Sequence, residues 1–116
     1  INEVNKEKMK NHTNIYFKAL GYDETDFIPS EISGQRAVDI HHIDCKGMGG
    51  NPLKDKDRIE NLQAVTREEH RRYGDRKECM FFLYSRHYNF LIDNGVKFDK
   101  QYLIDKMNMY YEDYVS

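Results

Sequence analysis

The amino-acid sequence predicts an α+β domain in which a two-stranded sheet and a short helix are flanked by longer helices. Two strand-like runs, 37–43 and 61–66, are separated by a glycine-containing loop, and a helical pattern follows the second run directly. Apolar residues at helical spacing occupy both ends of the chain. At 116 residues the chain suits one domain with a modest core.

The helices at the two ends divide the chain into parts. We expect an N-terminal helix and connector at 1–26, a central core at 27–77 and C-terminal helices at 78–116. The first helix is predicted over about 3–20, where Gly21 ends it. The last two helices are predicted over about 76–92 and 99–114, with a short turn between them.

Turn signals separate the elements of the central core. Gly34 predicts a hairpin or tight turn just before the strand at 37–43. The stretch 44–57 is typical of a loop because it contains three glycines, three aspartates, an asparagine and a proline. No helix follows its glycines directly, so they do not indicate a phosphate-binding helix entry.

The second strand leads into the helix of the core. Thr66 is a suitable N-cap, and Glu69 stands three residues later, at the spacing of a capping box. We therefore predict a helix over about 67–73, which carries His70 and ends at Gly74.

Composition and cysteine content exclude several classes of protein. A net charge of -2 is not that of a dedicated nucleic-acid binder, so any such surface requires local segregation of charge. No apolar run approaches the ~20 residues of a membrane span, and no signal peptide is visible, so we expect a cytoplasmic protein without a membrane partner. Cys45 and Cys79 are isolated, which excludes a thiolate zinc knuckle and fits a reducing compartment.

Three of the five histidines, His41, His42 and His70, gather in the central core. Adjacent residues of a strand point to opposite faces, so His41 can face a metal ion while His42 faces a substrate. Asp39 shares a strand face with His41, where it either binds the metal, orients His41 or is simply solvated. His12 and His87 lie outside this segment, and we interpret them as ordinary polar residues.

Two strands, a loop and a helix, with histidines on a strand and on the helix, form the ββα-metal arrangement, and here the chain resembles the HNH endonuclease family. The resemblance rests on His41, His42, Asn61 and His70. Colicin-type DNases also carry a His-His pair, and their central Asn precedes the last histidine by the same nine-residue step. The glycine-containing loop and the run around Asn61 look like phage and prophage HNH proteins. The resemblance covers about residues 27–77.

The resemblance implies metal-dependent hydrolysis of DNA phosphodiester bonds. His42 would be the general base, and one divalent ion (Mg, Mn, Ni or Zn) would bind His41 and His70, with Asp39 as a further ligand. Asn61 would orient the base or brace the loop, although Asn is also frequent at turns without a catalytic role.

The chain departs from the family pattern in two ways. Many HNH proteins bind a structural zinc through two Cys-x-x-Cys pairs, and the corresponding positions here are Ser30 with Ser33 and Thr66 with Glu69. Hydroxyls do not replace thiolates as structural zinc ligands, so we expect the core and the flanking helices to hold the module. The colicin-type pattern also places a metal-binding histidine one turn after the last one, and Gly74 stands there.

Basic residues near the last histidine predict a DNA-binding surface. Arg67, Arg71 and Arg72 belong to the predicted helix, Arg76 follows it, and Lys46 lies in the loop. Arg67 and Arg71 are four residues apart and so share a helix face. A solvated helix face is the usual meaning of such a run, but beside metal-ligand candidates we expect contacts with DNA phosphates.

Two other classes of function stay open on the sequence alone. A DNA-binding or assembly module that kept the HNH fold with weak or no cleavage would explain Gly74, whereas His42 and Asn61 argue against it. A structural zinc-binding domain is the second alternative, and the missing thiolates argue against that one.

Overall fold

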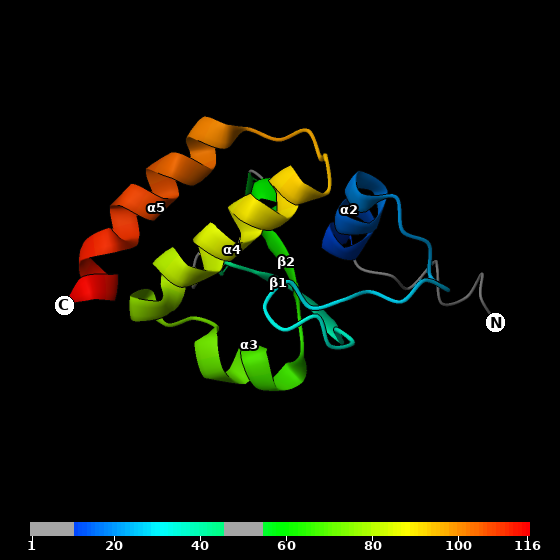
Figure 1. The fold of residues 1–116 in the computed structure, drawn as a ribbon, viewed down its shortest axis with the longest axis horizontal. Helices are drawn as coiled ribbons and strands as arrows, with labels where there is room; N and C mark the ends of the chain where they lie inside the picture. Colours follow the sequence, from blue (N-terminus) through cyan, green and yellow to red (C-terminus); the bar gives the residue numbers. More distant parts are fainter. Residues whose placement is uncertain (1–10, 46–54) are drawn as a thin grey trace.

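Figure 1 shows the fold in a computed structural model, which describes residues 11–45 and 55–116. The predicted α+β class is confirmed: within these residues, four α-helices accompany a two-stranded antiparallel sheet. In chain order the elements are α2 (Asn11–Leu20), β1 (Asp39–His42), the 3-10 helices η1 (Asp55–Asp57) and η2 (Ile59–Asn61), β2 (Leu62–Val65), α3 (Arg67–Tyr73), the 3-10 helix η3 (Lys77–Cys79), α4 (Met80–Asp93) and α5 (Lys100–Val115).

The sheet lies between the helices. β1 pairs antiparallel with β2, so that His41 lies opposite Gln63 and His42 lies opposite Leu62. Both strands are shorter than the predicted runs, because the paired stretch covers four residues of each. All four residues of β2 are buried, with α2 packed near the strand and α4 passing across it (Figure 1).

The predicted turn at Gly34 is confirmed. Pro29 and Arg36 form an isolated antiparallel bridge, and the Ser30 amide donates to the Gln35 carbonyl at 2.7 Å. The φ of Gly34 is +77°, in the left-handed region that favours glycine. The turn brings Ser30 back toward the start of α3.

A hydrogen-bonded junction joins this turn to α3. Ser30 Oγ donates to Glu69 Oε1 at 2.5 Å, and the same oxygen accepts from the Thr66 amide at 2.8 Å. The Glu69 amide donates to Thr66 Oγ1 at 3.1 Å, which completes the predicted capping box. Burial alone would raise the pKa of Glu69, but hydrogen bonds from Ser30, Ser33 and Thr66 lower it. Ser30, Ser33, Thr66 and Glu69 therefore meet, and their polar groups hold the turn against the helix.

Two clusters of buried side chains form the core. The first lies between α4 and α5 and includes Leu83, Leu91 and Leu103. The second lies between α2 and the sheet and includes Tyr16 and Ile40. The helices at both ends of the described chain therefore pack on the central unit, as the sequence predicts.

The flanking helices have shifted ends. α2 begins at Asn11 among the described residues, and the rest of the helix predicted at 3–20 lies outside them. α4 begins at Met80, later than predicted, because η3 takes the residues before it. α5 follows Asp99, whose side chain caps the helix by accepting from the Tyr102 amide at 3.1 Å. Within the described residues, no helix combines the length and apolar character needed to cross a membrane.

Candidate functional site

His41 lies in β1 with 4% of its surface exposed, and a defined hydrogen bond holds its ring. Its Nε2 lies 3.0 Å from Gln63 Oε1 on the facing strand, and Gln63 Nε2 donates to the Leu83 carbonyl at 3.0 Å. The second bond fixes which end of the amide faces His41. His41 Nε2 therefore carries the hydrogen, and Nδ1 keeps the lone pair that a metal ion needs.

A second imidazole with an unpaired nitrogen, that of His70 on α3, lies beside the His41 ring. The ring centroids of His41 and His70 are 5.2 Å apart, in an edge-to-face arrangement. The Nδ1 atoms of both rings are shielded from solvent and have no hydrogen-bond partner, which is rare for buried polar atoms. Asp39 Oδ2 lies 3.4 Å from His70 Nδ1 without forming a hydrogen bond. Both nitrogens are suited by their chemistry to bind a divalent metal ion, but the ligand atoms of Asp39, His41 and His70 do not all lie within 4.8 Å of one another, so these side chains would have to draw closer to share one ion.

Burial keeps the His41 ring neutral. Desolvation lowers its pKa to about 4, and although the hydrogen bond with Gln63 acts in the opposite direction, it is the smaller effect. The neighbouring His70 adds to the lowering. Because metal ions bind the neutral form of imidazole, His41 does not have to lose a proton near pH 7 before it binds one.

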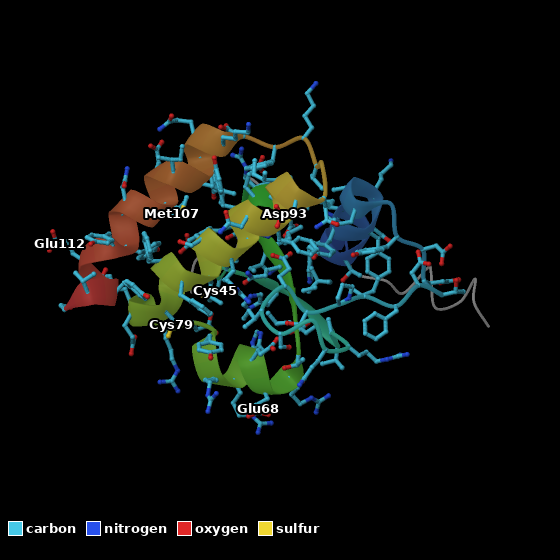
Figure 2. All side chains as sticks on the ribbon, in the orientation of Figure 1. Cys45, Glu68, Cys79, Asp93, Met107 and Glu112 are labelled. Atoms are coloured by element: carbon cyan, nitrogen blue, oxygen red, sulfur yellow. The ribbon has the colours of Figure 1, made fainter. Side chains whose placement is uncertain are left out.

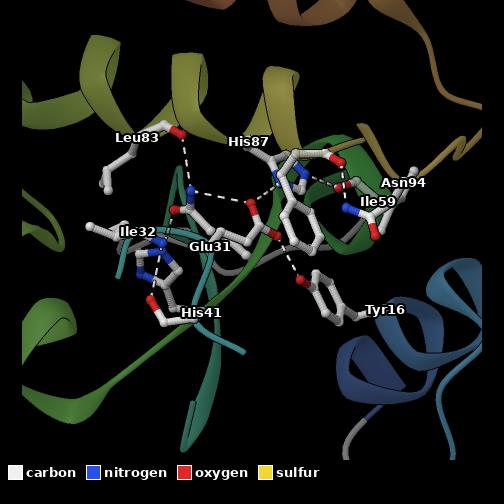
Figure 3. A network of polar contacts seen from close by, with 11 residues as sticks. Tyr16, Glu31, Ile32, His41, Ile59, Leu83, His87 and Asn94 are labelled. Atoms are coloured by element: carbon white, nitrogen blue, oxygen red, sulfur yellow. Dashed lines mark hydrogen bonds and ion pairs between the residues drawn. The ribbon is translucent and has the colours of Figure 1, made fainter. Parts of the chain in front are cut away.

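Gln63 belongs to a buried polar network. Figure 3 shows this network, with Glu31, His87 and Tyr16 among its labelled residues. Glu31 Oε1 accepts from His87 Nδ1 at 2.7 Å and lies 3.5 Å from Gln63 Nε2, and Glu31 Oε2 accepts from the Tyr16 hydroxyl at 2.6 Å. His87 Nε2 donates to the Ile59 carbonyl at 2.7 Å, so both ring nitrogens donate and the ring is cationic. Burial alone would lower the pKa of His87, but the Glu31 carboxylate and the carbonyl raise it. A buried ion pair thus supports the amide that holds the metal-ligand candidate on β1.

His42 lies on the opposite face of β1, toward α2 and η1. Its Nε2 lies 2.6 Å from Asp57 Oδ1, and the two side chains are only 12% and 10% exposed. A carboxylate accepts hydrogen bonds and does not donate them, so Nε2 carries the hydrogen and Nδ1 has the lone pair. The ring of His12 on α2 lies 4.5 Å from the His42 ring, tilted by 49°. The side chains of His42, Asp57 and His12 therefore form one cluster.

Asn61 is completely buried, and its side chain binds backbone atoms on both sides of the loop. Its Oδ1 accepts from the Asp44 amide at 2.8 Å, and its Nδ2 donates to the carbonyls of Asp44 and Lys56 at 3.0 Å and 2.9 Å. The Tyr84 hydroxyl lies 3.1 Å from the same Oδ1. Of the roles expected for Asn61, these bonds favour bracing the loop, and through Lys56 they also position Asp57.

One cleft is lined by His41 and His70 and also by the cluster of His42, Asp57 and His12. Its volume is about 510 Å³. The residues that line it are Asn11, His12, Asp39, Ile40, His41, His42, Cys45, Asp57, His70 and Asp75. The structure therefore brings together the predicted base and the three predicted metal ligands, which come from β1 and α3.

The four arginines predicted to bind DNA line one shallow groove beside α3. They are Arg67, Arg71, Arg72 and Arg76, and the acidic Glu68 lines the same groove. Figure 2 shows that the side chains of α3 around Glu68 project away from the rest of the fold. Arg67 and Arg71 also line a pocket with Asp39 and His70, so the basic surface is continuous with the metal-ligand candidates.

The residue after α3 cannot supply the further histidine of the colicin-type pattern. A Cβ atom at Gly74 would lie 2.4 Å from the His70 carbonyl oxygen, so this backbone has no room for a side chain there. Asp39 is better placed as a third ligand, because its carboxylate already lies beside His70. Lys46, the other predicted DNA contact, lies outside the described residues.

Sequence reasoning misses four residues of this region: His12, Asp57, Gln63 and Glu31. The ring of His12, interpreted from the sequence as an ordinary polar residue, packs on His42 in the cleft. His87, which was also interpreted as an ordinary polar residue, is a hydrogen-bonded core residue. Gln63 carries a signal in the sequence, since a polar residue inside a buried apolar strand needs a hydrogen-bonding partner. Asp57 and His12 carry none, because their contacts depend on how distant segments pack.

A scan against protein-family models found no match to this chain, and searches of curated proteins and of solved structures found none either. The function of the chain has to be inferred from its own residues and from the geometry of the cleft.

Proposed function

We propose that the chain is a metal-dependent HNH endonuclease that hydrolyses DNA phosphodiester bonds. The observation that carries this proposal is the pair of shielded, unpaired Nδ1 atoms of His41 and His70. The imidazole of His42 follows on the same strand and lines the same cleft, as a base beside a metal ion requires. The order of paired histidines, buried Asn61 and helix-borne histidine supports the resemblance to the HNH family.

His42 is the proposed general base. Because its Nε2 donates to Asp57, Nδ1 is the atom that accepts a proton from the attacking water. The water oxygen bonds to phosphorus while the bond from phosphorus to the 3′ oxygen breaks. The departing oxygen takes a proton from solvent, which leaves 5′-phosphate and 3′-hydroxyl ends. Asp57 is a positioning residue in this scheme, since it fixes the tautomer and the orientation of the His42 ring.

His41 and His70 would hold the divalent ion, with Asp39 as the third protein ligand. When bound, the ion supplies Lewis-acid neutralisation of the charge on the phosphate and on the departing oxygen. Imidazole nitrogens suit zinc and nickel, and the carboxylate also allows manganese or magnesium, so the donor set leaves the metal open. Gln63 keeps His41 in the tautomer that binds the ion.

The arginine-lined groove beside α3 is the proposed contact with DNA. Its four guanidinium groups provide the local positive charge that the chain as a whole, with a net charge of -2, does not have. We expect contacts with phosphates, which position DNA without reading its sequence. We also propose a cytoplasmic location, which is supported by the two cysteines, Cys45 and Cys79, being free thiols.

Incubation of supercoiled plasmid with the protein and Mg, Mn, Ni or Zn tests the proposal. We expect nicked or linear DNA with at least one of these ions, and none after chelation. His42→Ala should slow cleavage by ~10²–10⁴-fold, because it removes the general base, while DNA binding and the binding of an ion at His41 and His70 persist. Asn11→Ala, which alters the same cleft wall without touching a proposed role, is the matched control. Cleavage by His42→Ala at the wild-type rate would exclude His42 as the base.

A DNA-binding or assembly module with an HNH fold is the second candidate. Gly74 favours it, because this position offers no side chain as a ligand. DNA binding without cleavage in every ion tested would select this alternative. A structural zinc domain has less support, because Ser30 and Glu69 already form a metal-free junction where the zinc thiolates would stand.

A further inference from the structure

A second group of possible ligand atoms lies in the cleft, apart from His41 and His70. His12, His42 and Asp57 offer two imidazoles and one carboxylate from three different elements, α2, β1 and η1. Their ligand atoms all lie within 4.8 Å of one another, and no other set of three His, Cys, Asp or Glu residues in the described chain meets this spacing. Two histidines and one carboxylate are a common donor set for zinc, with water in the fourth position.

The second group is separate from the first because β1 stands between them. Adjacent strand residues point to opposite faces, so His41 is directed toward α3 while His42 is directed toward α2. No residue belongs to both groups. Each group can therefore hold an ion of its own, although both line the same cleft.

We propose that His12, His42 and Asp57 form a second divalent-cation site, selective for zinc-like transition ions, and that filling this site withdraws His42 from its role as base. The first half of this proposal stands without any enzymatic activity. The second half rests on the proposed nuclease function.

The two sites should fill in a fixed order. His42 Nε2 and Asp57 Oδ1 are 2.6 Å apart and hydrogen-bonded, so an ion has to displace that hydrogen and widen the pair. Two ligands bound tetrahedrally at ~2.0–2.1 Å from zinc are about 3.3 Å apart. The Nδ1 atoms of His41 and His70 have no hydrogen bond to lose. The first equivalent of zinc should therefore occupy that pair, and the second should bind more weakly at His42.

An ion bound to His42 prevents this imidazole from acting as a base. A neutral ring carries one hydrogen, and an ion that binds His42 Nε2 takes the lone pair of that nitrogen, so the hydrogen resides on Nδ1. Nδ1 then cannot accept a proton from water. The second equivalent of zinc should consequently inhibit cleavage. Magnesium prefers an octahedron of oxygen ligands and should not occupy this site.

Calorimetric titration of the full chain with zinc tests the site directly. Wild type should bind two ions with different affinities. His12→Phe should bind one, because phenylalanine keeps an aromatic ring against His42 but offers no ligand atom. Asn11→Ala, on the same cleft wall, should still bind two. Long-range proton–nitrogen NMR should report the His42 hydrogen on Nε2 with one equivalent and on Nδ1 with two, and in His12→Phe it should stay on Nε2.

The outcomes separate the second site from the nuclease proposal. A single zinc ion in wild type, or two in His12→Phe, would overturn the second site. Plasmid cleavage by wild type should fall by about 10²-fold or more at the second equivalent, whereas His12→Phe should keep the rate it shows with one. An unchanged wild-type rate with both sites filled would overturn the inhibitory role. A chain that binds two ions but cleaves no DNA would support the site and overturn the nuclease function.

Discussion

The two faces of β1 hold their histidines in different ways. On one face, His41 is 4% exposed and is hydrogen-bonded to Gln63, which a buried ion pair supports from below. On the other face, His42 is held by Asp57 across a more open contact beside α2. The proposed metal ligand His41 is held by a buried network in the tautomer that leaves Nδ1 with a lone pair, whereas the proposed base His42 is held by one carboxylate and can exchange that partner for another. Two adjacent residues of β1 thus differ in how firmly they are held: His41 is fixed by buried contacts, whereas His42 can exchange its hydrogen-bond partner.

The largest expected effect comes from breaking the support of the His41 face. His87→Gln leaves Glu31 buried without its cation, so the free energy of unfolding should fall by about 3–5 kcal/mol. Urea denaturation of wild type and variant measures this loss. A loss below about 1 kcal/mol would mean that the ion pair contributes no more than an exposed one and does not support this face.

The pH dependence of stability checks the same ion pair. The pKa of His87 is raised in the folded protein, so the folded state binds this proton more tightly than the unfolded chain does. Its contribution is complete below the ordinary histidine pKa of about 6.5 and is lost as pH rises through the higher folded-state pKa. The stability difference between wild type and His87→Gln should therefore shrink as pH increases above about 6.5. A difference that grew with pH would contradict this assignment of charge.

Gln63→Leu tests whether the network prepares the metal ligand. Without the amide oxygen, the His41 ring loses the bond that selects its tautomer, and affinity for the first metal ion should fall by roughly 10–100-fold. Calorimetry with one equivalent of zinc measures the change. Asp57→Asn is the control from the other face and should leave this affinity unaltered. Equal losses in the two variants would remove the distinction between the faces.

Asp57→Asn should act on the rate of cleavage. We expect kcat to fall by about tenfold, less than the loss of the base itself, with KM nearly unchanged because Asp57 orients His42 and does not bind DNA. NMR should find the His42 hydrogen shared between the two ring nitrogens in the variant. Asp57→Glu, which keeps a carboxylate, should recover part of the rate. A rise in KM alone would instead assign Asp57 to substrate binding.

Arg71→Glu has the smallest expected effect and extends the comparison to the arginine-lined groove beside α3, the proposed contact with DNA. Loss of one phosphate contact should flatten the salt dependence of DNA binding by roughly one unit of log–log slope, for all sequences alike. Lys100→Glu, at the exposed start of α5, makes the same charge change away from the cleft. Metal content has to be equal in both variants, because Arg71 neighbours His70. An unchanged slope in metal-loaded Arg71→Glu would mean that DNA approaches from another side.

The parts of the fold that the sequence predicts are those with local signals. The capping box of Thr66 and Glu69 is encoded within one turn of helix, and the opposite directions of His41 and His42 follow from strand geometry. Helix periodicity predicts α4 but not the 3-10 turn that delays its start to Met80. Periodicity reports which residues are apolar, and it does not distinguish the first turn of a helix from the turn before it.

The parts of the candidate site that the sequence does not predict depend on contacts between distant segments. Gln63 reaches His41 because the register of the sheet places them opposite each other. Asp57 contacts His42 from a 3-10 helix, and His12 contacts it from the first described helix. No local sequence pattern predicts these two contacts. The metal-ligand candidates were recognisable as residue types, whereas the groups that orient them required the packed structure.

The bonds of Asn61 also bear on how well the chain tolerates insertions between Asp44 and Lys56. They fix the backbone at Asp44 and Lys56, so the distance between these two points does not depend on how many residues join them. Doubling the length of a flexible loop between fixed ends costs only about 0.6 kcal/mol in closure entropy. Residues inserted between Asp44 and Lys56 should therefore leave His42 and Asp57 in place.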